Sequence, residues 1–162
     1  MAHFQRWLVA GVCAGLVLAG WGSRVPGPLA GGLGRIPAGV HAVAVTPVFG
    51  LNRNTRLDRL DRAFTVTAPG RVARIVALAD GLPLFPPGLF SCPSGFGGQM
   101  RLAFLTRPGG PVLALLTADF GGCQGVSVRI GGRNQAALGG PGSPVPPFPD
   151  EILAIAGVSW PH

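Results

Sequence analysis

The residues best suited to defined chemistry are two cysteines. Cys92 and Cys123 bracket a predicted β-hairpin at nearly equal distances, whereas Cys13 lies in an apolar N-terminal run. A disulfide needs Cα atoms about 4.4 to 6.8 Å apart, a separation that neighbouring strand ends provide without distortion of the backbone. The spacing therefore predicts a Cys92–Cys123 disulfide. The alternative is a pair of reduced, buried thiols, because cysteine is among the most buried residue types.

Residues suited to catalysis or metal binding are few and poorly spaced for either. His41 and His162 have no cysteine or carboxylate at metal-ligand spacing, so we expect no metal site and no cofactor. Asp119, Asp150 and Glu151 could form an acid/base pair, but the two adjacent acids after a proline also suit the first turn of a helix. We therefore assign no catalytic residue. A secreted hydrolase with an unrecognised carboxylate pair centred on Asp119 stays as an alternative.

A proline-rich segment at 82–90 is a candidate binding loop. Its candidate binding residues are Phe85, Pro86, Pro87 and Phe90. Two phenylalanines are costly to leave in water unless they pack or bind, so one interpretation is contact with a partner. The other interpretation is that both rings close the core beneath the loop. The segment 93–98, beside the expected disulfide, could also serve as the rigid loop of a protease inhibitor.

The charge is basic but scattered. The formal net charge is +7, and all 13 basic side chains are arginine. In the densest stretch, 53–62, Asp58 and Asp61 interleave with four arginines and no aromatic residue lies between them. A single-strand nucleic-acid site would need aromatic stacking platforms, so we expect a solvated face and no specific nucleic acid. An anionic polymer of the cell envelope is the partner that this charge would favour.

The N-terminus has the pattern of a targeting segment. His3 and Arg6 precede an uncharged apolar run from Trp7 to Trp21, which is short for a membrane span of about 20 residues. Small residues near its end favour a secretory signal peptide over residues 1–20. The alternatives are a buried helix and an uncleaved signal anchor, through which the chain would contact a membrane. A Pro/Gly-rich linker is expected at 21–39, followed by a single domain at 40–162.

Two helices are predicted in this domain. Apolar residues recur at helical spacing over 69–81, where Pro69 suits the first turn and Gly81 suits the C-terminal cap. A shorter terminal helix is predicted from Pro149 to Gly157, with acidic residues in its first turn.

Strands are predicted where apolar and polar residues alternate. This pattern occurs near 43–45, at 64–67 and at 126–130, the last ending at the turn Gly131-Gly132. Pro47 indicates that the first of these is an edge strand or ends there.

The central element is a hairpin of strands at 99–104 and 112–118, joined by the turn residues Arg107 to Gly110. Pairing Thr106 with Pro111 fixes the register and brings both cysteines to the open end of the hairpin. The pairs expected on one face are Phe104 with Leu113 and Leu102 with Leu115. Together the elements predict an α+β fold: a small antiparallel sheet of about five strands, with two helices packed on one side and one disulfide.

The order of these elements resembles that of a set of secreted proteins from high-GC Gram-positive bacteria. The likeness covers residues 64–157 and is most specific at Ser91-Cys92-Pro93 and Gly122-Cys123, with the hairpin between them. It implies export and the disulfide. That family has no established activity, and the Arg-rich stretch 53–62 and the N-terminal leader lie outside the likeness.

The expected function is therefore an exported, non-catalytic module that binds a protein or polymer partner. We expect it at the cell envelope or outside the cell, since disulfides persist in oxidising compartments. The secreted hydrolase and the protease-inhibitor-like module are the alternatives.

Overall fold

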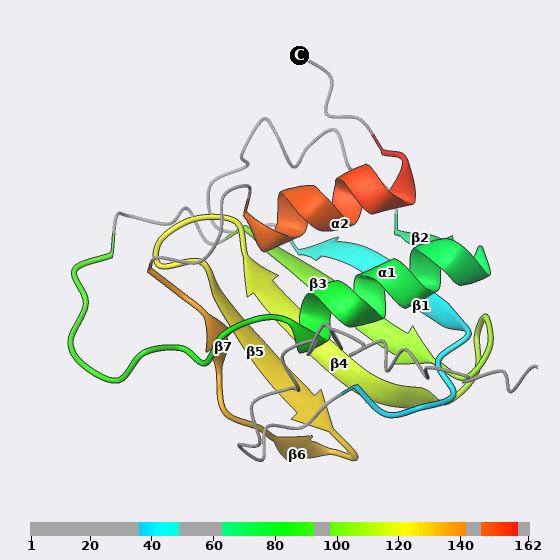
Figure 1. The fold of residues 1–162 in the computed structure, drawn as a ribbon, viewed down its shortest axis with the longest axis horizontal. Coiled ribbons are helices and arrows are strands. Elements are labelled where there is room, and N and C mark those ends of the chain that lie inside the picture. Colours follow the sequence, from blue (N-terminus) through cyan, green and yellow to red (C-terminus); the bar gives the residue numbers. More distant parts are fainter. Residues whose placement is uncertain (1–35, 49–62, 93–97, 142–146, 159–162) are drawn as a thin grey trace, which may run out of the picture. The chain divides into compact units, whose positions relative to one another are not determined.

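The computed structural model describes residues 36–48, 63–92, 98–141 and 147–158, all within a compact unit that spans Gly32–His162. The signal peptide, most of the linker and the Arg-rich stretch predicted from the sequence lie outside the described residues. In the described part, antiparallel strands form a sheet in the order β2-β1-β3-β4-β5-β6, and β7 pairs with β5 (Figure 1). The strands are β1 (Ala42–Val48), β2 (Phe64–Val66), β3 (Gln99–Leu105), β4 (Val112–Asp119), β5 (Gly125–Ile130), β6 (Arg133–Asn134) and β7 (Leu138–Gly139).

The α+β fold is confirmed, but the expected strand count was too low. The described sheet has seven strands instead of about five, because β6 and β7 are two residues long. A two-residue strand shows no periodicity, and Gly139 falls in a Gly/Pro-rich stretch that reads as a linker. Both short strands pair with β5, so the chain after the Gly131-Gly132 turn runs back along that strand.

Both predicted helices are confirmed, and they lie on one face of the sheet (Figure 1). Helix α1 (Pro69–Asp80) has proline in its first turn and ends at Gly81, whose backbone N–H donates to the Ala77 carbonyl at 3.0 Å. Helix α2 (Phe148–Ala156) has acidic residues in its first turn, where the helix dipole favours negative charge. It ends at Gly157, whose φ of 76° is a left-handed conformation that glycine adopts without steric cost.

Strand β1 lies inside the sheet, between β2 and β3. Its pairing with β2 covers Val43, Ala44 and Val45, whereas its pairing with β3 continues through Pro47. Pro47 therefore stands at the end of the strand, past the residues that pair with β2. Of the two placements predicted for Pro47, an edge strand or a strand end, the structure has the second. Proline has no backbone N–H to donate to a neighbouring strand, so it is tolerated past the residues that pair with β2.

The hairpin of β3 and β4 forms, but its predicted register is wrong by one residue. Thr106 donates to the Pro111 carbonyl at 3.2 Å as expected, and the register then shifts between Phe104 and Leu105. Beyond this β-bulge, Phe104 pairs with Ala114 and Leu102 pairs with Leu116. An inserted residue reverses which side chains face the core. The nearly continuous apolar run of β4 carries no alternation that could reveal the shift.

The core is one layer of side chains between the sheet and the two helices. Its fully buried members include Val43, Val45, Ile75, Met100, Leu102, Phe104, Leu116, Val126, Ile152 and Leu153. Because side chains alternate along a strand, the residues between them point to the opposite face of the sheet. That face carries Arg101, Thr117, Ser127 and Arg129, which are exposed or half-buried.

Candidate functional site

The predicted disulfide is confirmed. Cys92 and Cys123 are bonded, with their Cα atoms 5.0 Å apart. The bridge joins the end of the loop that follows α1 to the turn between β4 and β5. Cys123 lies in that turn, where Gln124 donates to the Gly121 carbonyl at 3.2 Å, and not on a straight extension of β4. The bond therefore ties the loop to the open end of the β3–β4 hairpin, as the cysteine spacing predicted.

The first half of the loop is held against the edge of the sheet. Leu84 forms an isolated antiparallel bridge with Leu138, the first residue of β7. Two backbone hydrogen bonds support it: the Phe85 N–H donates to the Ala137 carbonyl at 2.9 Å, and the Gly139 N–H donates to the Pro83 carbonyl at 2.8 Å. The loop is thus fixed by backbone pairing at its start and by the disulfide at its end.

Phe85 packs beneath the loop. Its ring lies over Gly125 and Gly140, so closely that a Cβ atom on Gly140 would be 2.8 Å from it. Gly140 also has a φ of +101°, which L side chains rarely adopt. Pro86 contacts the same glycine and is half-buried. Phe85 is therefore half-buried against these glycines, and its role in binding stays a prediction.

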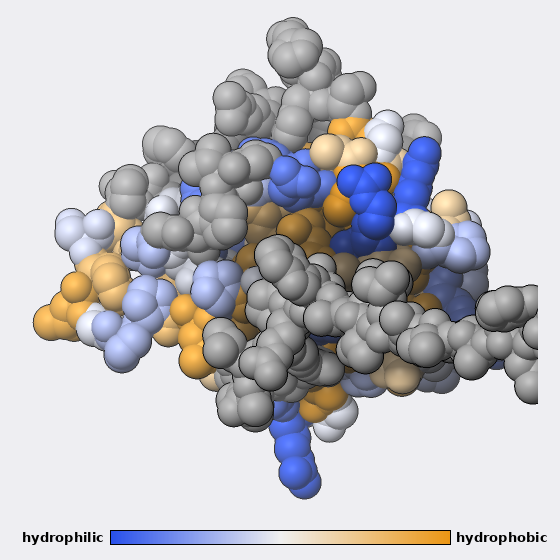
Figure 2. Space-filling model, in the orientation of Figure 1, coloured by the Kyte–Doolittle hydropathy of each residue, from blue (hydrophilic) through white to orange (hydrophobic). Residues whose placement is uncertain are grey.

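Both halves of the loop project apolar side chains into solvent. Leu89 is completely exposed (105% of its reference area), Leu84 is 50% exposed and Phe90 is 39% exposed. These three residues, called the apolar loop surface below, account for all but Val112 of the exposed large hydrophobic residues in the described part of the chain. Figure 2 shows hydrophobic atoms at the left edge of the molecule, where this loop projects in Figure 1.

Phe90, in the second half of the loop, rests on Phe85, in the first half. The Phe90 ring meets the Phe85 ring edge to face, with centroids 5.8 Å apart. Gly88, with a φ of +131°, turns the chain at this point and lies against the Phe90 ring. Prolines at 86 and 87 restrict the backbone further. The loop therefore presents its apolar surface on a restrained backbone.

The carboxylates considered for catalysis lie at the end of β4 and at the start of α2. Asp119, at the end of β4, accepts a hydrogen bond from the Gln99 side-chain amide at 2.8 Å. Asp150 and Glu151 lie in the first turn of α2, as predicted. His41 is exposed, and His162 lies outside the described residues. Among the residues that the structure describes, no three His, Cys, Asp or Glu side chains gather as a metal site would require.

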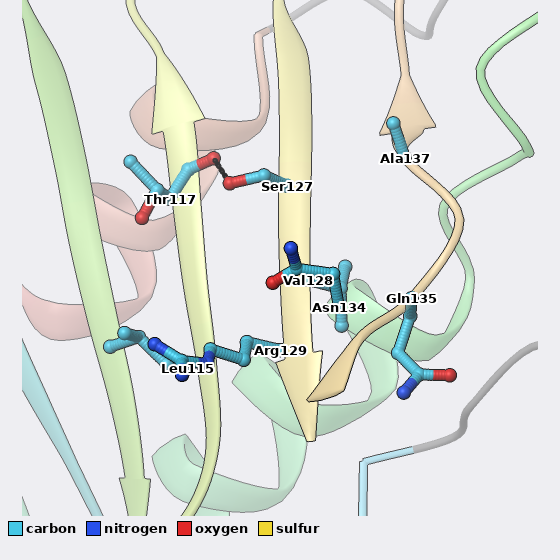
Figure 3. A pocket seen from close by; sticks show the side chains of 8 residues that line it. All are labelled: Leu115, Thr117, Ser127, Val128, Arg129, Asn134, Gln135 and Ala137. Atoms are coloured by element: carbon cyan, nitrogen blue, oxygen red, sulfur yellow. Dashed lines mark hydrogen bonds between the residues drawn. The ribbon is translucent and has the colours of Figure 1, made fainter. Parts of the chain in front are cut away.

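Sequence reasoning missed a hollow on the open face of the sheet. It has a volume of about 430 Å³ and lies between β4, β5 and the segment that returns through β6 (Figure 3). It is lined by Leu115, Thr117, Ser127, Val128, Arg129, Asn134, Gln135 and Ala137. The alternation of Ser127 and Arg129 with buried valines was visible in the sequence. The returning segment that forms the far wall has no such pattern.

Comparison of the chain with known protein families, with curated proteins and with solved structures finds no match. The resemblance to secreted bacterial proteins therefore stays a prediction. No helix within the described ranges is long and apolar enough to cross a membrane. In the segment 93–98, considered as an inhibitory loop, residues 93–97 lie outside the described residues.

Proposed function

We propose that this chain is an exported, non-catalytic module that binds a protein partner outside the cell through its apolar loop surface. The disulfide is consistent with an oxidising compartment, where such bonds form and persist. The apolar N-terminal run supports export.

The observation that carries the proposal is the full exposure of Leu89 on a loop that is fixed at both ends. Burying a leucine or phenylalanine side chain contributes about 1.5 to 3 kcal/mol. Within the described fold, Leu89 gains none of this free energy of burial, and Phe90 gains only part of it. Contact with an apolar cleft on a partner would supply the rest. Because the loop is already restrained by Phe85 and the disulfide, docking would cost less conformational entropy than ordering a free segment.

The chemistry of the loop favours a protein over a polymer at this site. Phe90, Leu89 and Leu84 offer apolar atoms, and the two prolines have no backbone N–H to donate. Hydrated, charged envelope polymers would gain little from such a surface, whereas aromatic and aliphatic anchors dominate protein interfaces.

Photo-crosslinking in the producing cells tests this proposal. A photoreactive amino acid at position 89 is expected to capture a specific extracellular protein, which mass spectrometry identifies. The same amino acid at position 112 is the matched control, because Val112 is also an exposed apolar residue (57%) but lies at the far end of the hairpin. It should not capture that protein.

The captured protein is then purified and titrated with the chain. Leu89→Ser combined with Phe90→Ser should weaken binding by about 100-fold, since two buried anchors are lost. Val112→Ser should leave the affinity unchanged. Equal capture at both positions, or equal affinity of the loop variant and the wild type, would refute the proposed role of the loop.

A further inference from the structure

We propose that the hollow on the open face of the sheet is a second binding site, which takes an acidic polysaccharide. This site shares no residue with the apolar loop surface, so it does not rest on the function proposed above. The occupant is inferred from the charge and the hydrogen-bonding groups of this face.

The strand register places the polar side chains of the site next to one another. Thr117 of β4 pairs with Arg101 of β3 on one side and with Ser127 of β5 on the other. Directly paired residues have Cβ atoms about 4.5 to 5.5 Å apart. These three side chains form a row across three strands. Leu115 and Arg129 form the next pair along the same face.

Arg129 is held in position over this face. Its Nε donates a hydrogen bond to the Gly132 carbonyl at 3.0 Å, within the turn that follows β5. Figure 3 shows its side chain crossing from β5 toward Leu115 on β4. The terminal guanidinium nitrogens thus lie beside the hollow, where they could donate paired hydrogen bonds to a carboxylate. Arg101 is exposed and lies in the neighbouring row of side chains, beside Thr117.

The remaining groups suit the hydroxyls of a sugar. Thr117 and Ser127 bring hydroxyls, and Asn134 and Gln135 bring amides that both donate and accept. Ser127 uses its hydroxyl proton on the Thr117 carbonyl at 3.4 Å, which leaves its oxygen as an acceptor. An anionic ligand with many hydroxyls would match this combination of arginines, hydroxyls and amides.

Both sides of the described fold carry charges of both signs. The helix layer holds Asp80, Asp150 and Glu151 together with Arg71 and Arg74, and Asp80 also accepts a hydrogen bond from the Ile36 backbone at 2.8 Å. None of the eight residues that line the hollow is acidic. Arg107 and Arg133 lie in or beside the turns at one end of the same strands. The open face also carries Asp119, two residues beyond Thr117 on β4, where it accepts a hydrogen bond from Gln99. Arg101 and Arg129 outnumber this carboxylate, and the excess of positive charge attracts a polyanion.

A single-stranded nucleic acid fits the site less well. Such ligands stack their bases on aromatic side chains, and none of the eight lining residues is aromatic. The ligand chemistry that remains is a repeating sugar with an acidic group.

The test uses polygalacturonate, which carries one carboxylate per sugar, and titrates it calorimetrically against the full chain. Neutral dextran and single-stranded DNA are the comparison ligands. We expect polygalacturonate to bind more tightly than either, and its affinity to fall as salt is raised, because salt screens exposed charges.

Three variants locate the site. Arg101→Gln removes a side chain for which the structure shows no hydrogen bond, and it should weaken binding about threefold. Arg101→Gln combined with Arg129→Gln should weaken it about tenfold or more, because the positioned guanidinium is lost too. Arg74→Gln on the exposed face of α1 removes the same charge from the helix layer and should leave the affinity within about twofold.

Some results would overturn the proposal. They are the absence of binding at physiological salt, equal binding of dextran, tighter binding of DNA than of polygalacturonate, or an equal loss for Arg74→Gln. Thermal melting of each variant checks that it is folded. Leu89→Ser with Phe90→Ser should bind polygalacturonate as the wild type does, which separates this site from the loop.

Discussion

Replacing Cys123 by serine should cause a large loss of stability. The disulfide closes a segment of 31 residues, and the chain-entropy relation gives about 3.7 kcal/mol for a loop of this length. The compact unit spans Gly32–His162, and an unfolding entropy of about 2.1 cal/mol/K per residue converts that energy to a fall in melting temperature of about 13 °C. Small domains are stabilised by only about 5 to 15 kcal/mol in total, so this is a substantial share.

Calorimetric melting with and without reductant measures this effect. Oxidised wild type should melt highest, and reductant should lower it to near the temperature of Cys123→Ser. The variant itself should show no further fall with reductant. Cys92→Ser should melt like Cys123→Ser and be equally insensitive to reductant, because it removes the other half of the same bridge. If Cys123→Ser and oxidised wild type melt together, the disulfide contributes nothing to the fold and the reasoning fails.

Substitutions in the sheet and under the loop give further tests. Gly140→Val should lower the unfolding free energy in urea by about 2 to 5 kcal/mol, because its side chain would meet the Phe85 ring and its φ is positive. Gly70→Ala, where nothing lies within 4 Å of an added Cβ, should be neutral or slightly stabilising in the same measurement. Leu116→Ala should cost about 2 to 5 kcal/mol in urea, and Leu115→Ala clearly less, since the bulge buries the first and turns the second to the open face. The reverse order for the two leucines would contradict the observed register.

The part of the fold that the sequence predicts is the part with strong periodicity. Helix α1 has apolar residues at helical spacing and clear end signals, and both of its ends were predicted within one residue. Strand β5 alternates strictly between polar and buried apolar side chains. In such segments the local pattern and the packed face agree, so the pattern alone is sufficient.

The register of β4 could not be predicted, because its sequence has no strong periodicity. The run from Val112 to Ala118 is apolar on both faces apart from Thr117, so either face could be buried. Which one is buried depends on a bulge near the turn, and the small Ala114 opposite the large Phe104 ring is compatible with it. A one-residue insertion of this kind is set by tertiary packing and leaves no signal in the period.

The candidate site was predicted in part. The cysteine pair was recognisable from its spacing, and the Pro-rich loop from its composition. The different exposure of Phe85 and Phe90 was not, because Phe85 packs against Gly125 and Gly140, which are distant in sequence. The hollow depends on a return segment whose strands are two residues long.

Intact-mass spectrometry of the protein released by producing cells tests the central claim most directly. The account predicts a mature chain that lacks about the first 20 residues and is two hydrogens lighter than its reduced form. Full-length chain found only inside the cells, with all of its thiols free, would contradict it.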